Sequence, residues 1–296
     1  MELRAQEKHY RLSDRLIRAI SHWQLTDKDD DIEELIDAGA DINRVHGTLL
    51  PLHCACMVGD SEVVTLLLEK GAKVDAVDGY GRTAIHYAAE RDEICLEILL
   101  EHGASIDSGD GNKDTALHWA SYKNNVPCVS LLLCHGANVN ARDFNNDTPV
   151  SWAACKGNLD VIRILLDYNA DPDIRSFLGS TALQRSIAVQ VSGLNTAQDN
   201  ECLLLLVRAS GRLDLGQREQ PRSAALGSHV NAVLTNLRPI FRNARSLLDL
   251  CRRQIRRSLG QVYLPKVVQS LPIPSSLQEF ILLREDTALL ELESLN

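Results

Sequence analysis

The sequence has no long apolar run and few aromatic residues. Its longest uninterrupted hydrophobic stretch, 202–207, is far shorter than the roughly 18 residues that a membrane-spanning helix needs. The first ten residues carry Glu2, Arg4, Glu7 and Lys8, which leaves no room for the apolar region of a signal peptide. Aromatic residues make up only 4% of the chain, a low content for a protein that stacks sugars or bases. We therefore expect no membrane partner and no secretory route.

Cysteine pairs with the spacing of a metal site are also absent. The eight cysteines are at positions 54, 56, 95, 128, 134, 155, 202 and 251, and none forms a Cys-x-x-Cys pair. Most of them sit inside apolar helical patterns. A disulfide framework or zinc site would need tighter spacing, so we expect reduced thiols in a cytoplasmic or nuclear protein.

The charge of the chain is unevenly distributed. The formal net charge is −9, yet residues 213–296 hold 11 basic against 8 acidic side chains. Subtracting these from the totals of 31 and 40 leaves 20 basic and 32 acidic side chains in residues 1–212. The first part is therefore about −12 and the second about +3, which indicates two modules with different partners.

Two short motifs recur in phase through the first two thirds of the chain. The first motif, spaced by 32, 32, 33 and 33 residues, occupies Gly39–Asn43, Gly71–Asp75, Gly103–Asp107, Gly136–Asn140 and Asn169–Asp173. The second keeps the same period and occupies Leu50–Ala55, Thr83–Ala88, Thr115–Ala120, Thr148–Ala153 and Thr181–Ser186. Such a double period is typical of a repeat solenoid, whose units stack to bury a common core. This pattern resembles the ankyrin repeat, which implies an all-α solenoid of helix pairs.

Each part of the repeat has a physical role. Threonines at 83, 115 and 148 can cap the first helix of a unit with a hydroxyl group. Glycines at 71, 103 and 136 can supply the left-handed residue that ends the second helix. The ends of the array are less regular. Residues 12–43 are predicted to form a variant first unit, and the last unit closes about nine residues late, with the extra length near 192–200.

Residues that suggest chemistry follow the same period. His53, His86 and His118 are spaced by 33 and 32 residues, which could indicate a metal ladder or a structural hydrogen bond between loops. The structural role is favoured, because Ser151 and Gln184 take the place of histidine in later units. The aromatic series 87, 119 and 152 is predicted to pack half-buried rather than to contact a ligand. Cysteines 54, 134 and 155 have no paired base, and no phosphate loop or nucleophile elbow is present, so we expect no enzyme activity, cofactor or metal.

A second helical region follows a polar stretch at 217–228. Leu247, Cys251 and Ile255 are four residues apart, on one face of a predicted helix, and Leu259 extends the row. A rigid segment, Leu271–Pro274, lies about twenty residues further on, before a final helix through 277–283. This order resembles the SOCS box, a three-helix module. The resemblance implies that Leu247, Cys251, Ile255 and Leu259 bind elongin C and that Leu271, Pro272, Ile273 and Pro274 bind cullin-5.

The arginines of this region allow two interpretations. Seven arginines and one acid, Asp249, lie between 238 and 257, which could mark a nucleic-acid or nuclear-localisation patch. They could instead pair with an acidic partner surface. The second interpretation is favoured, because the rest of the chain is acidic and would repel nucleic acid.

Together, the two modules resemble the ankyrin repeat and SOCS box family over nearly the whole chain. The predicted order is a variant unit at 1–45, ankyrin repeats at 46–215, a linker at 216–240, a SOCS box at 241–284 and a tail at 285–296. The resemblance implies a non-catalytic adaptor that brings target proteins to a ligase of elongin B, elongin C, cullin-5 and a RING-box protein, for ubiquitination and degradation. The alternative is a non-ligase ankyrin scaffold that could be nuclear. Its basic helix would then serve localisation or nucleic-acid contact.

A target protein of unknown identity is expected at the loop tips and on the exposed side of the first helices, as is usual for ankyrin proteins. Aromatic residues at exposed tips can anchor an interface. The candidate loop residues are Tyr80, Arg82, Asn112, Asp114, Phe144, Asn145 and Asp147, and the candidate helix residues are Arg91, Tyr122, Lys123 and Lys156.

Overall fold

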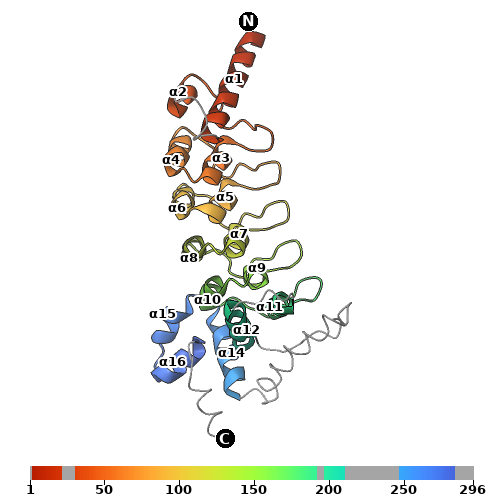
Figure 1. Cartoon of the computed structure of the whole chain (residues 1–296). Helices are drawn as coiled ribbons and strands as arrows, with labels where there is room; N and C mark the ends of the chain where they lie inside the picture. Colours follow the sequence, from red (N-terminus) through yellow and green to blue (C-terminus); the bar gives the residue numbers. More distant parts are fainter. Residues whose placement is uncertain (1, 22–30, 192–196, 211–246, 284–296) are drawn as a thin grey trace. The chain divides into compact units, whose positions relative to one another are not determined.

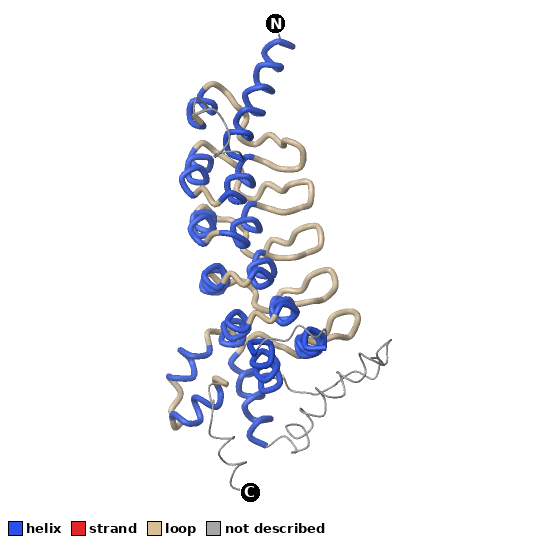
Figure 2. Tube along the Cα trace, in the orientation of Figure 1, coloured by secondary structure: helices blue, strands red, loops and turns tan. Residues whose placement is uncertain are grey.

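The computed structural model describes residues 2–21, 31–191, 197–210 and 247–283 of the chain. These residues are helical and carry no strand, which confirms the all-α prediction (Figure 2). They belong to two compact units, 1–137 and 138–296. The predicted linker at 216–240 and the tail at 285–296 lie outside the described residues, as does the late closing segment at 211–215.

In its described residues, the first unit has four helix pairs. The first helices of the pairs are α1 (Glu2–Ser21), α3 (Pro51–Val58), α5 (Ala84–Arg91) and α7 (Ala116–Lys123). The second helices are α2 (Ile32–Asp37), α4 (Ser61–Glu69), α6 (Glu93–Glu101) and α8 (Val126–Cys134). Helices α3, α5 and α7 stack in one row and α4, α6 and α8 in a second, with the loops between pairs on the side of the first row (Figure 1).

The helix boundaries follow from the residues at their ends. Thr83 and Thr115 occupy the N-cap positions of α5 and α7, as predicted. The second helices begin with an acid or amide instead; the side chain of Asp92, for example, accepts a hydrogen bond from the Cys95 N–H at 3.0 Å. Gly71 and Gly103 follow α4 and α6 with φ of 94° and 81°, a left-handed conformation that a side chain would strain.

Packing between successive helix pairs of the first unit relies on small residues in the first row of helices and on leucines in the second row. Ala88 and Ala89 of α5 are fully buried, which lets neighbouring first helices approach closely. Leu67 and Leu99 are fully buried in α4 and α6. Burying each leucine stabilises the stack by roughly 1.5–3 kcal/mol. Because a single helix pair cannot hide these faces by itself, stability depends on stacked neighbours.

The second unit continues the repeat and adds a smaller module. Its repeat helices are α9 (Pro149–Lys156), α10 (Leu159–Asp167), α11 (Ala182–Val191) and α12 (Ala197–Ala209). Helix α9 packs against α10 and α11, and α12 packs against both of the latter. Helix α12 has 13 residues where α10 has nine, which agrees with the predicted irregularity of the last repeat.

Three helices form the described part of the C-terminal module, as the sequence predicted. They are α14 (Leu247–Leu259), α15 (Leu264–Gln269) and α16 (Ser275–Ile281). Their core consists of Leu264, Val268, Ile281 and Leu282, with Leu259 and Ile273 packed at its edge. Among the residues that are described, no helix has the length and apolar character needed to cross a membrane.

Candidate functional site

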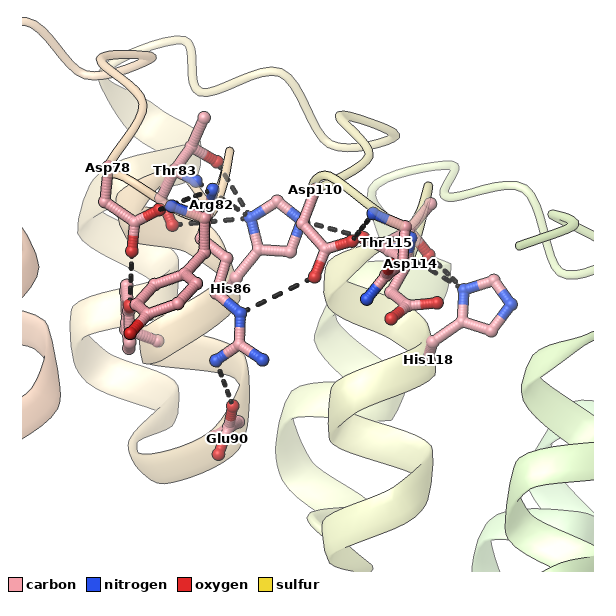
Figure 3. Close-up of polar contacts among 12 residues, drawn as sticks. Asp78, Arg82, Thr83, His86, Glu90, Asp110, Asp114, Thr115 and His118 are labelled. Atoms are coloured by element: carbon pink, nitrogen blue, oxygen red, sulfur yellow. Dashed lines mark hydrogen bonds and ion pairs between the residues drawn. The ribbon is translucent and has the colours of Figure 1, made fainter. Parts of the chain in front are cut away.

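The repeated histidines form structural hydrogen bonds inside the solenoid. The Nδ1 atom of His86 accepts the Thr83 N–H at 3.1 Å, so the proton is on Nε2, which donates to the Asp114 carbonyl at 2.9 Å (Figure 3). His53 makes the equivalent bonds with Leu50 and with Ala76 of the following loop. Both rings therefore tie the start of one helix to the next loop. Burial lowers the pKa of His53 and of His86, which keeps both neutral at pH 7.

Later repeats fill the histidine position with other acceptors. The Ser151 hydroxyl accepts the Thr148 N–H at 3.0 Å, and the Gln184 Oε1 atom accepts the Thr181 N–H at 2.9 Å. Each of these residues satisfies one backbone donor at a helix N-terminus. The common element at this position is a hydrogen-bond acceptor, which supports the structural role over a metal ladder.

The aromatic series also serves the repeat itself. The Tyr87 hydroxyl donates to the Asp78 carboxylate at 2.5 Å, and the Trp152 Nε1–H donates to the Asp143 carboxylate at 3.1 Å. All three aromatic residues of the series, 87, 119 and 152, are half-buried, as predicted. The polar atoms of Tyr87 and Trp152 thus hold acids of the loops in front of them, and the ring face of Trp119 contacts Arg82.

Three of the predicted target-binding residues face inward. Arg82 is half-buried, stacks at 3.9 Å from the Trp119 ring centre, and lies 3.4 Å from Glu90 and 3.5 Å from Asp110 (Figure 3). It therefore braces two neighbouring repeats. The prediction that Asp114 and Asp147 are exposed at loop tips is wrong, because each is only 5% exposed.

The two buried acids have internal partners that explain their placement. The Asp114 N–H donates to the Asp110 side chain at 3.0 Å, and its carbonyl accepts the His86 bond. The Asp147 carboxylate pairs with Arg185 and accepts the Ser151 hydroxyl at 3.3 Å. Both residues therefore hold loops in shape and are removed from the candidate binding surface.

The other predicted residues lie on the surface. They are Tyr80, Arg91, Asn112, Tyr122, Lys123, Phe144, Asn145 and Lys156. Two exposed apolar residues were missed, Phe177 and Leu178, which are 78% and 90% exposed. The repeat period could have found them, because Phe177 follows Phe144 by one repeat of 33 residues.

The predicted elongin C row lies along α14. Ile255 is exposed, whereas Leu259 packs at the edge of the internal core of the module. The backbones of Leu247 and Cys251 belong to the same helix, but their side chains lie outside the described residues. Of the four predicted positions, Ile255 is thus available to a partner, whereas Leu259 stabilises the module.

The predicted cullin segment, 271–274, is a turn between α15 and α16. Pro272 and Pro274 are exposed, and Leu271 and Ile273 are half-buried. The Gln278 side-chain amide donates to the carbonyls of Leu271 and Ile273 at 3.3 and 3.2 Å. This amide and the fixed φ of the prolines hold the turn in one shape.

The arginines of α14 are more internal than the sequence suggested. Arg256 is 8% exposed and donates to the backbone carbonyls of Leu166 and Ile281. Burial lowers its pKa to about 10, which leaves it charged at neutral pH. Arg252 donates to the Arg208 carbonyl at 2.9 Å and lies 4.5 Å from the Phe280 ring centre. The expectation that these arginines pair with a partner is therefore wrong for Arg252 and Arg256; those at 238, 242 and 245 lie outside the described residues.

The fold and these surfaces define an ankyrin-repeat protein with a C-terminal helical binding module. A family model for ankyrin repeats matches residues 16–110 and 95–176, and a SOCS box model matches residues 243–282. Ankyrin repeat and SOCS box protein 8 from Homo sapiens and from Macaca fascicularis are each 52% identical to the chain over 280 residues, which covers 94% of this chain and 96% of theirs. The Mus musculus protein of that name is 51% identical over the same length. The chain belongs to the ankyrin repeat and SOCS box family.

The two matched modules define a general role. Ankyrin repeats and a SOCS box support a substrate-recognition adaptor of cullin-RING ubiquitin ligases. A SOCS box implies elongin B, elongin C and a cullin as partners in general. In this role the chain recognises the proteins on which such a ligase acts.

Proposed function

We propose that this chain is the substrate receptor of a ligase formed with elongin B, elongin C, cullin-5 and a RING-box protein. The observation that carries the proposal is the pairing of two elements in one three-helix module. Ile255 is exposed on α14, and the Leu271–Pro274 turn is held rigid beside the internal core. An exposed apolar side chain on a helix, such as Ile255, fits binding in a hydrophobic groove, which is the contact proposed with elongin C.

The rigid turn supports the proposed cullin-5 contact. Pro272 and Pro274 are exposed, and the bonds from Gln278 already fix the backbone between them. A segment held in its bound shape loses less conformational entropy on association. The chain itself would contribute proximity between target and ligase, and the transfer of ubiquitin would take place elsewhere.

The alternative of a nucleic-acid-binding scaffold has less support. Its basic helix needs arginines that reach out to phosphates. Arg252 and Arg256 instead bind backbone carbonyls within the second unit. The four arginines of α14 thus contribute fewer outward cations than their number suggests.

Co-purification of elongins tests the proposal. Elongins B and C, co-expressed with the full chain, should co-purify with the wild type and be lost with the combined substitutions Leu247→Asp, Cys251→Phe and Ile255→Asp. The control is Gln254→Ala, an exposed position on the same helix, which should retain both elongins. Circular dichroism checks that each variant stays helical. Retention of both elongins by the folded triple variant would refute the proposal.

A further inference from the structure

Two neighbouring loops of the second unit carry large exposed apolar side chains. Phe144 is 67% exposed at the tip of loop 142–148, and Phe177 and Leu178 are 78% and 90% exposed at the tip of loop 175–181. The tips are adjacent, because the Phe177 N–H donates to the Asn145 carbonyl at 2.9 Å. Isolated exposed apolar residues are ordinary, but three on two hydrogen-bonded loops form a patch that indicates a binding surface.

The loops do not need these side chains in order to fold. In the first loop, the Asp143 carboxylate accepts the N–H groups of Asn145 and Asp147, both at 2.8 Å. In the second loop, the Ser176 hydroxyl accepts the Ser180 N–H at 3.2 Å. The backbone is thus fixed from beneath by buried polar groups, and the apolar tips are displayed on a rigid support. A rigid display of this kind lowers the entropic cost of binding.

The earlier loops of the repeat differ at the same position. Counting back from Phe144 by one repeat leads to Gly111, and by two repeats to Gly79. A Cβ atom at Gly111 would lie 2.8 Å from the Tyr80 carbonyl oxygen, so no side chain fits there without a shift. The last two loops accept a phenylalanine at this position. A phenylalanine at this position is therefore a local property of these two loops of the second unit and not a requirement of the repeat.

The charge at these tips is positive, although the chain as a whole is acidic. Within loops 142–148 and 175–181 the exposed charged residues are Arg142 and Arg175, whereas Asp143 and Asp147 are buried. A guanidinium group suits the recognition of a carboxylate in a fixed geometry. Arginine beside aromatic residues is also the usual composition of the residues that dominate interface energy.

We infer that the tips of loops 142–148 and 175–181 form the docking surface for an extended target segment in which acidic residues flank apolar ones. Phe144, Phe177 and Leu178 contact the apolar side chains of the target, and Arg142 and Arg175 bind its carboxylates. The inference rests on the proposed function, since it describes the target end of the same adaptor. A nucleic acid, the other polymer that aromatic and arginine side chains can bind, is an outcome of the test.

A random peptide library provides the probe. A displayed library of 12-residue peptides is selected on the full chain co-expressed with elongins B and C. We expect enriched peptides to carry Asp or Glu beside Leu, Ile or Phe. In fluorescence anisotropy, the Phe144→Ser, Phe177→Ser double variant should bind these peptides about tenfold more weakly or worse. The Arg142→Glu, Arg175→Glu variant should also weaken binding, and added salt should weaken the wild type.

Val77→Ser is the control, because Val77 is an exposed apolar residue in a loop of the first unit and is not among the candidate target-binding residues. Its affinity and the melting temperatures of all variants should equal those of the wild type. The inference is overturned if no peptide is enriched, if enriched peptides lack acidic residues, if only Val77→Ser weakens binding, or if a 12-nucleotide single-stranded RNA binds more tightly than every peptide.

The elongin result is read separately. Tip variants that keep elongins B and C but bind peptides as well as the wild type overturn this inference alone. Elongins that fail to co-purify with the wild type overturn the proposed function alone, and the peptide selection is then made on the chain without them.

Discussion

The Nη1 atom of Arg256 lies 3.0 Å from the carbonyl oxygen of Ile281, at the C-terminal end of α16. The same guanidinium donates to the carbonyl of Leu166 in the last turn of α10. A cation at two helix C-termini meets the negative ends of two helix dipoles, which explains why it is stable in a buried position. Arg256 thus joins the SOCS box to the last repeats within the second unit.

Replacing Arg256 with lysine should destabilise the second unit. A lysine ammonium group cannot span both carbonyls in the fixed geometry of a guanidinium, so at least one buried acceptor loses its partner. Hydrogen bonds to charged groups contribute about 1.5–3 kcal/mol each, and we expect the free energy of unfolding to fall by about 2 kcal/mol. Urea denaturation measures the loss, and hydrogen exchange should show faster opening of α14 and α16.

Arg257→Lys is the matched control. The Arg257 side chain is 55% exposed and lies 3.9 Å from Asp171, a surface pair worth at most a few tenths of a kcal/mol. Equal stability losses for the two lysine variants would contradict the assigned role of Arg256.

The buried histidines make the repeats sensitive to acid. The pKa of His86 is lowered from its usual 6.5, chiefly by burial, so below pH 6.5 the unfolded chain binds a proton that the folded chain does not. The stability contributed by the neutral ring is fully present above pH 6.5. It is lost as pH falls below 6.5 toward the lower folded pKa, at up to about 1.4 kcal/mol per pH unit.

His86→Gln should reduce this pH dependence while keeping the fold. Glutamine is compatible with this position of the repeat, because Gln184 accepts the N–H of Thr181 at the equivalent position. Thermal melts between pH 5 and 8 should show a shallower loss of stability for His86→Gln than for the wild type. His102→Gln changes an exposed histidine at the C-cap of α6 and is the control. Parallel melting curves for wild type and His86→Gln would refute the prediction.

Much of the fold could be predicted because its determinants are local and repeated. Caps such as Thr83 and left-handed glycines such as Gly71 act on residues close in sequence. The same period that predicted the histidine role, with His86 bonded to the next loop, would also have found Phe177.

Contacts between distant segments were not predictable in this way. Arg256 meets Leu166 across 90 residues, and nothing in the local pattern of α14 separates it from the exposed Arg257. Asp114 and Asp147 are charged loop residues of the kind that is common at exposed tips. Both are nevertheless buried against partners that only the folded loops bring near. The direction of a polar side chain at a loop is therefore the part of the site that sequence reasoning misjudged.

A close backbone contact between loops provides the last prediction. The Gly111 N–H donates to the Tyr80 carbonyl at 3.0 Å, and an added Cβ would lie 2.8 Å from that oxygen. Because the obstacle is backbone rather than a flexible side chain, Gly111→Ala must push the two loops apart. We expect a loss of roughly 1–3 kcal/mol in the free energy of unfolding, the usual range for overpacking. Urea denaturation measures it against Asn112→Ala, whose exposed side chain can be shortened while its N–H bond to Asp110 is kept. If Gly111→Ala were as stable as Asn112→Ala, this backbone contact would not control loop spacing.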